Sequence, residues 1–167
     1  MRTWPRSLQS GTTPTSSVLA RCRVTSSCER VLLDTNIVSE LRKRDRMDAG
    51  LATWRRANHG SELWLSVLVL GELRRGIELL RRRDVDAAQS LETWLAGLVD
   101  DFGDRLLPVD ARVVESWGRL GVPDPVPVVD GLMAATAITH ELTLVTRNTA
   151  DAEATGVGVI NPFEAEA

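Results

Sequence analysis

The sequence predicts a single α/β domain built on a mainly parallel sheet of about five short strands, with helices on both faces. Short apolar runs alternate along the chain with longer stretches of helical periodicity, which is the order of elements in parallel sheets. The length of 167 residues and the apolar content of 43% suit one domain with its own core. We place this domain at residues 31–167. Ligands of such sheets bind beyond the carboxyl ends of the strands, so side chains there are the first functional candidates.

In the first half of this domain, residues with a known local role separate the elements. Asp34 follows the first strand and is a capping residue for the helix after it. Gly60 closes the second helix, and Asp84 restarts helical periodicity after the third. The elements predicted here are a strand over 31–33, helices over 37–44 and 47–58, a strand over 63–66, and helices over 67–83 and 84–99.

In the second half, Asp110 caps a helix, and the proline-rich segment 122–127 is predicted as a loop because proline interrupts helices. The elements predicted here are strands over 105–107, 142–145 and 157–160, and helices over 110–120, 129–140 and 148–154.

Residues 1–30 differ in composition from the rest of the chain. Their net charge is +4, whereas residues 31–167 carry −7. The segment is rich in Ser, Thr and Arg and lacks periodicity, so we expect a disordered leader. Two explanations stay open: an organelle transit peptide, for which no amphipathic helix is found, and a translation start assigned too far upstream, which we favour.

Composition also excludes several classes of protein. No window approaches the roughly 18 uninterrupted apolar residues of a membrane span, so we expect no membrane segment. The two Cys and two His are too few and too badly spaced for a disulfide framework or a structural zinc site. A domain of charge −7 that acted on nucleic acid would need local arginines or bound cations to offset repulsion from phosphates.

Four carboxylates occupy positions that are unusual for carboxylates. Asp34 comes directly after the first strand and Asp151 lies six residues past Val145, so both are expected at the carboxyl edge of the sheet. The spacing of apolar neighbours predicts that Glu72 and Asp130 project from the apolar stripes of their helices. Burying an unpaired carboxylate costs several kcal/mol, and a hard divalent cation such as Mg²⁺ or Mn²⁺ removes that conflict.

Each acid also has a simpler interpretation, and only the joint pattern favours a metal site. The alternatives that stay open are helix capping by Asp34 and Asp130, ion pairing of Glu72 with Arg74 or Arg75, and a turn position for Asp151.

Four motifs around these acids resemble the PIN-domain ribonucleases, and specifically the VapC-type toxins of type II toxin–antitoxin pairs. The closing segment 155–163 resembles the Fit-type branch, so the resemblance covers 31–163, and the departures are the leader and Gly131 after Asp130. The motifs are VLLDTN at 31–36, SVLVLGELRRG at 66–76, VDGLMAATA at 129–137, and LVTRN at 144–148 leading to Asp151.

The resemblance implies that Asp34, Glu72, Asp130 and Asp151 form a catalytic pocket that binds one or two Mg²⁺ or Mn²⁺ ions. The implied reaction is endonucleolytic hydrolysis of RNA, for which a metal-activated water is suited. Asn36 resembles a group that fixes the Asp34 loop, and Thr146 and Asn148 resemble the supporting polar residues of the pocket. Candidates for binding substrate phosphates are Arg74, Arg75, Arg147 and the basic runs 42–44 and 81–83, which could instead be solvated helix faces.

The resemblance also implies partners and a location. We expect a homodimer in the bacterial cytoplasm and a small DNA-binding, VapB-like antitoxin that joins it in a larger hetero-oligomer. The antitoxin's C-terminal segment is expected to fill a groove walled by Leu51 and Trp54 and by the Leu79–Leu80 end of the helix over 67–83.

Two other function classes remain. A catalytically weak PIN module could act mainly as the partner of a DNA-binding antitoxin in a repressor complex. An aspartyl-phosphate phosphatase is disfavoured because no second Asp stands two residues after Asp34 and because Lys43 is the only lysine after the leader.

Overall fold

The computed structural model describes residues 29–122 and 125–164, in which five parallel strands form one sheet with the order β3-β2-β1-β4-β5. The mainly parallel sheet predicted from the sequence is confirmed, and each of its four strand pairings is parallel. The strands are β1 (Arg30–Leu33), β2 (Glu62–Ser66), β3 (Leu106–Leu107), β4 (Thr143–Val145) and β5 (Val159–Ile160).

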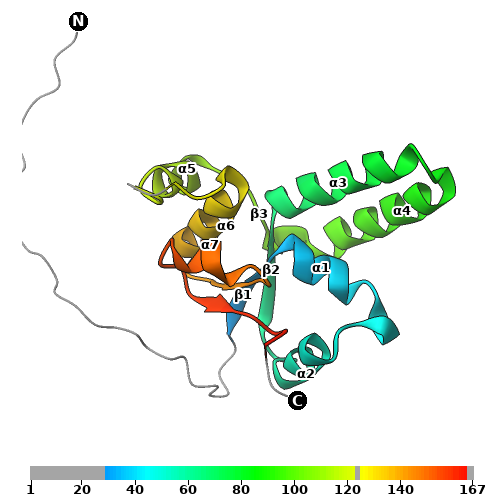
Figure 1. Cartoon of the computed structure of the whole chain (residues 1–167), viewed down its shortest axis with the longest axis horizontal. Coiled ribbons are helices and arrows are strands. Elements are labelled where there is room, and N and C mark those ends of the chain that lie inside the picture. Colours follow the sequence, from blue (N-terminus) through cyan, green and yellow to red (C-terminus); the bar gives the residue numbers. More distant parts are fainter. Residues whose placement is uncertain (1–28, 123–124, 165–167) are drawn as a thin grey trace, which may run out of the picture.

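Helices cover both faces of the sheet, as expected. Figure 1 shows α1, α3 and α4 on one side of the strands and α5, α6 and α7 on the other. The helices are α1 (Thr35–Leu41), α2 (Ala49–Ala57), α3 (Val67–Arg81), α4 (Val85–Phe102), α5 (Ala111–Trp117), α6 (Val128–Thr139) and α7 (Thr149–Glu153), with 3₁₀ turns η1 (Arg44–Arg46) and η2 (Gly103–Arg105).

The core lies where the central strands meet the helices. Val31, Leu32 and Leu33 of β1 are at most 1% exposed, as expected for a strand covered on both faces. The register pairs Leu33 of β1 with Val145 of β4. The residues that follow this pair therefore emerge side by side at the carboxyl edge.

Two helices end at other residues than predicted, and in each case a residue with a positive φ lies close to the observed end. The first helix ends at Leu41 rather than at 44, and Arg44, with a positive φ of 50°, begins the separate turn η1, so the α-helix does not continue through it. α4 continues to Phe102 and ends at Gly103, whose φ is 49°. Most of the predicted leader, with both cysteines, lies outside the described residues, and Arg30 already belongs to β1.

No helix within 29–122 and 125–164 is both long enough and apolar enough to cross a membrane.

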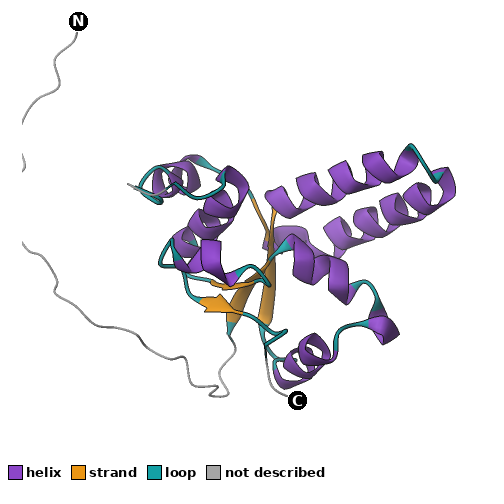
Figure 2. Cartoon of the chain, viewed as in Figure 1, coloured by secondary structure: helices purple, strands orange, loops and turns teal. Residues whose placement is uncertain are grey.

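Helices α3 and α4 form a hairpin that extends away from the sheet (Figure 2). A small separate cluster of Ile77, Ala88 and Leu95 packs between them. This hairpin therefore depends on its own contacts more than on the sheet.

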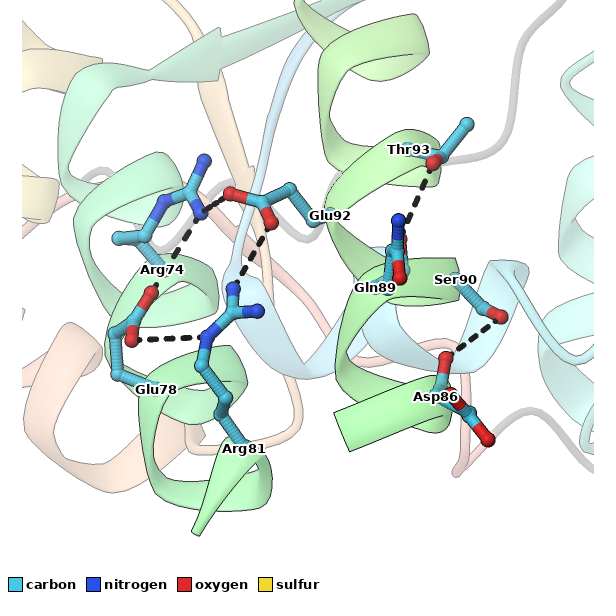
Figure 3. Close-up of polar contacts among 8 residues, drawn as sticks. All are labelled: Arg74, Glu78, Arg81, Asp86, Gln89, Ser90, Glu92 and Thr93. Atoms are coloured by element: carbon cyan, nitrogen blue, oxygen red, sulfur yellow. Dashed lines mark hydrogen bonds and ion pairs between the residues drawn. The ribbon is translucent and has the colours of Figure 1, made fainter. Parts of the chain in front are cut away.

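Ion pairs bridge the two helices of the hairpin (Figure 3). The Glu92 carboxylate of α4 accepts hydrogen bonds from the guanidinium groups of Arg74 and Arg81, the latter at 2.9 Å. Glu78 completes the network at 3.2 Å from Arg81 Nε and 3.8 Å from Arg74 Nη1. The hydrogen bonds from Arg74 and Arg81 lower the pKa of the Glu92 carboxyl below its ordinary value of 4.5.

We expect Glu92→Gln to lower the melting temperature at pH 7 by roughly 1–3 °C. A carboxyl with a lowered pKa in the folded state stabilises the fold above its unfolded pKa, and this contribution is lost as pH falls through the lowered value. The difference between variant and wild type should therefore shrink below pH 4.5. Thermal denaturation at pH 7 and at about pH 3 measures this.

The matched control is Glu115→Gln, because the pair of Glu115 with Arg119 lies within α5 and its neighbouring turn and is 74–80% exposed. Its melting temperature should equal that of the wild type. Equal melting temperatures for Glu92→Gln and wild type at pH 7 would show that the network does not stabilise the hairpin.

Candidate active site

Asp34 is the first residue after β1, and its carboxylate is held by three donors. The backbone N–H of Thr35 donates to Oδ1 at 2.6 Å, so Asp34 caps α1, as its simpler interpretation predicts. The Asn36 amide and the Thr146 hydroxyl both donate to Oδ2, the hydroxyl at 2.6 Å. A carboxylate has about four acceptor positions, so roughly one remains for a ligand.

Thr146 links the end of β4 to this carboxylate. It is 2% exposed, and its hydroxyl oxygen also accepts from the Asn36 amide at 3.2 Å and from the Asn148 backbone N–H at 3.0 Å. The Asn148 side chain in turn donates to Asp151 Oδ2 at 2.7 Å. The three polar residues predicted to support the pocket therefore connect Asp34 to Asp151.

Glu72 lies on the first half of α3, and its predicted core-facing orientation is wrong. The residue is exposed, because the stripe it belongs to also contains the exposed Gly76 and the 55% exposed Leu79 on the protruding hairpin. Its carboxylate still reaches the site, since it accepts a hydrogen bond from the Thr35 hydroxyl. Thr35 was not among the predicted site residues, and its position between Asp34 and Asn36 was the available signal.

Asp130 lies in the first turn of α6 and is half-buried. Burial raises the pKa of its carboxyl above the ordinary value, and the negative charges of Asp151, Asp34 and Glu72 raise this pKa further. The four predicted acids are therefore close enough to repel one another. The capping alternative for Asp130 is wrong, because Pro127 occupies the N-cap of α6.

The absence of a side chain at Gly131 allows α5 to pack closely against α6, the helix that carries Asp130. A Cβ at Gly131 would lie 3.0 Å from two atoms of the Trp117 indole. Glycine here lets Trp117 pack against α6 directly beside the acid.

The donor set fits a hard cation that keeps much of its water. Within 29–122 and 125–164, no three Asp, Glu, His or Cys side chains are close enough together to bind one ion jointly. Mg²⁺ is commonly bound through one or two carboxylates with waters completing its shell, so this spacing suits Mg²⁺ better than a fully dehydrated ion. Asp34 is held in one orientation by its three donors, and Asp130 is partly buried and repelled by the neighbouring acids.

The arginines predicted to bind phosphate differ in their surroundings. Arg74 does not pair with Glu72 but joins Glu78 and Glu92 in the hairpin network. Arg75 is exposed. Arg147 is exposed at the edge of the site, with its guanidinium 3.8 Å from the centre of the Phe163 ring.

Comparison with known proteins supports the family resemblance that the four motifs indicate. Residues 31–156 match the PIN domain family model. The chain is 33% identical to the plasmid stability protein StbB of Pseudomonas syringae pv. tomato, a match that covers 81% of this chain and 99% of StbB. It is 32% identical to the VapC ribonuclease Y4jK of Sinorhizobium fredii, over 80% of this chain and 98% of Y4jK.

Two further matches point to the Fit-type branch. The chain is 31% identical to the toxin FitB of Neisseria gonorrhoeae, over 80% of this chain and 98% of FitB. The structure of FitAB bound to a DNA fragment matches with a TM-score of 0.71 and 28% identity, over 82% of this chain and 98% of that chain. The predicted resemblance is confirmed, and the chain belongs to the PIN-domain family.

Proposed function

We propose that this protein is the toxin of a type II toxin–antitoxin pair and acts as a Mg²⁺-dependent endoribonuclease that also accepts Mn²⁺. The observation that carries the proposal is the hydrogen-bonded chain from Asp34 through Thr146 and Asn148 to Asp151 at the carboxyl edge of the sheet, with Asp130 close enough to be repelled by these acids. Carboxylates that repel one another across a sheet edge are destabilising unless a cation or a proton joins them. The similarity to a VapC ribonuclease supports RNA as the substrate.

Each residue of the site has a defined task in this proposal. Asp34 and Asp130 hold the cation, which when bound supplies an activated water and neutralises charge on the scissile phosphate. Asn36 and Thr146 keep Asp34 in a single orientation through their hydrogen bonds to Oδ2. Asn148 orients Asp151 in the same way from the other side of the site. Glu72, held by the Thr35 hydroxyl, adds negative charge at the open edge.

Metal binding should be measurable as a change in stability. We expect Mg²⁺ or Mn²⁺ to raise the wild-type melting temperature, because a cation that binds only the folded state stabilises it. Asp130→Asn should melt higher than wild type in EDTA, because one repelling charge is gone, and should respond much less to metal. Differential scanning fluorimetry in EDTA and in each metal measures both effects.

Asp86→Asn is the control for this experiment, since Asp86 lies in the first turn of α4 at the far end of the hairpin (Figure 1). It should respond to metal as the wild type does. A wild-type melting temperature that is insensitive to both metals would rule out the site.

Cleavage should require the metal and the acids together. We expect the purified protein to cut total RNA at discrete positions in Mg²⁺ or Mn²⁺ and to leave it intact in EDTA. Asp34→Asn and Asp130→Asn should each lower the rate about 100-fold or more, since each removes a charge that positions the ion. Gel analysis of the RNA fragments measures this, with Asp86→Asn expected to cut normally.

If the folded, metal-binding wild type leaves RNA intact, the proposal of nuclease activity fails. The chain would then act as the catalytically weak partner of a DNA-binding antitoxin.

The proposed antitoxin-binding surface differs from the groove predicted from the sequence. Leu51 is fully buried and Trp54 is 9% exposed, so both belong to the core and cannot line a groove. A hollow of about 510 Å³ lies instead against α1, α3 and α4, with the Arg42 guanidinium 5.7 Å from the centre of the Trp94 ring. Its lining residues are Arg42, Leu80, Ala87, Ser90, Leu91 and Trp94. The similarity to FitAB bound to DNA supports a DNA-binding partner.

We expect Leu80→Asp to weaken antitoxin binding about tenfold or more, because it places a charge in an apolar contact. Isothermal titration with the purified cognate antitoxin measures the affinity. Leu79→Asp is the matched control, since Leu79 is 55% exposed and is not a lining residue of this hollow. Equal losses for the two variants, or no loss for Leu80→Asp with an unchanged melting temperature, would exclude this surface.

A further inference from the structure

We propose that the C-terminal segment 161–163 positions Arg147 to bind a backbone phosphate of RNA next to the cleavage point. Asn161 and Phe163 are the positioning residues, and Arg147 makes the contact. This inference rests on the proposed function, and it assigns a substrate-binding task to a part of the chain outside the acidic site.

The backbone of Arg147 is fixed beside the acids. Its N–H donates to Asn36 Oδ1 at 3.2 Å, and its carbonyl oxygen accepts from Asn161 Nδ2 at 3.5 Å. Its two chain neighbours are Thr146, which binds Asp34, and Asn148, which binds Asp151. The backbone of Arg147 is therefore held in a fixed position relative to Asp34 and Asp151.

The guanidinium of Arg147 lies over an aromatic ring with its donors available. It is 3.8 Å from the centre of the Phe163 ring, a distance typical of a cation–π contact, which covers one face of the group and leaves its N–H edge open. In the described part of the chain, no carboxylate oxygen lies within 4.0 Å of it, whereas Arg74 and Arg81 are both ion-paired. An arginine edge of this kind matches a phosphate through two parallel hydrogen bonds.

The carboxylate of Glu40, which is buried nearby, binds other donors than the Arg147 guanidinium. Arg147 contributes to lowering the pKa of Glu40, but the Lys43 ammonium is the main cause. The Glu40 oxygens accept from Lys43 Nζ at 2.6 Å and from the Asp48 N–H at 3.1 Å. The positive charge of Arg147 is therefore still available to a ligand.

The segment that carries Phe163 is itself held in place. Pro162 is buried, and its carbonyl oxygen would lie 2.5 Å from a Cβ at Gly50, so the chain passes directly over the start of α2. Asn161 Oδ1 accepts the Phe163 N–H at 3.1 Å, which fixes the ring relative to the residue that binds the Arg147 carbonyl. One short segment thus holds both the backbone and the side chain of Arg147.

RNA is the ligand that the proposed function brings to this surface, and the charges around it require a cationic contact. Residues 31–167 carry −7, and the four acids concentrate negative charge at the same sheet edge. An RNA strand brought to those acids needs cationic contacts beside the metal, because its phosphates are otherwise repelled. Arg147 is the exposed arginine whose neighbours bind the acids directly.

The test measures binding of a fluorescein-labelled single-stranded RNA by anisotropy in EDTA across a salt series, together with kcat and KM for its cleavage in Mg²⁺. Arg147→Ala should raise Kd about tenfold and reduce the slope of log Kd against log salt by about 0.7, the value for one lost phosphate contact. Phe163→Leu keeps the apolar packing but removes the π face, so it should raise Kd and KM about two- to fivefold with kcat unchanged. Phe163→Tyr should restore wild-type values.

The double variant separates positioning from a general loss of structure. Phe163→Leu combined with Arg147→Ala should bind no more weakly than Arg147→Ala alone, because the ring acts through the arginine. Arg105→Ala controls for loss of charge and should leave the salt slope unchanged, because Arg105 lies over the Phe102 ring directly before β3, at the amino edge of the sheet. The inference would be overturned if the increases in Kd caused by the two substitutions multiplied in the double variant. It would also be overturned if Arg147→Ala left Kd unchanged.

Failure of this inference and failure of the proposed function give different results. An RNA affinity that depends on Arg147 without any cleavage in Mg²⁺ or Mn²⁺ refutes the nuclease and supports the phosphate contact. Metal-dependent cleavage with an unchanged KM in both single variants supports the nuclease and refutes the contact.

Discussion

The hydrogen bond from the Thr146 hydroxyl to Asp34 connects the ends of two adjacent parallel strands, and the site is arranged around it. The register that pairs Leu33 with Val145 brings these two residues side by side as the strands end. Asp34 also donates its N–H to the Val145 carbonyl, so backbone and side-chain bonds close the same junction. Because Thr146 is almost fully buried, its hydroxyl has few alternative partners, and the Asp34 carboxylate stays fixed. The loops that carry Thr35 and Asn148 begin from this junction.

Asp130 is the member of the site that this hydrogen-bonded chain does not hold. It comes from α6, whose approach is set by packing, including the contact of Trp117 with Gly131. Its carboxyl is partly buried and faces three other negative charges, so burial first and these charges second raise its pKa. Such an arrangement lowers stability locally and is typical of sites where a bound ligand restores the balance.

The order of strands and helices could be predicted because apolar spacing and capping residues are local properties of the chain. Which face of a helix is covered is not local, and the errors follow from that. Glu72 shares a stripe with apolar residues, and Val69 of that stripe is buried, yet α3 leaves the sheet as part of a hairpin, and the stripe is exposed from Glu72 through Gly76 to Leu79. The apolar side chains of Leu51 and Trp54 are compatible in sequence with either a groove wall or the core, and in the structure both are buried in the core. The Phe163–Arg147 contact joins two segments whose meeting only the tertiary structure determines.

Helix α3 serves two regions of the molecule at once. Its first half presents Glu72 to the Thr35 hydroxyl, and its second half contributes Leu80 to the hollow against α4. The two residues are eight positions apart, so about two helical turns of one rigid element separate the acidic site from the partner surface. A change that shifts or unfolds α3 as a whole would therefore act on both regions, whereas a side-chain substitution at Leu80 leaves the hydrogen bond between Glu72 and Thr35, two turns away, in place. Asp130 lies on α6, outside the elements that line the hollow, so a substitution there addresses the acidic site alone.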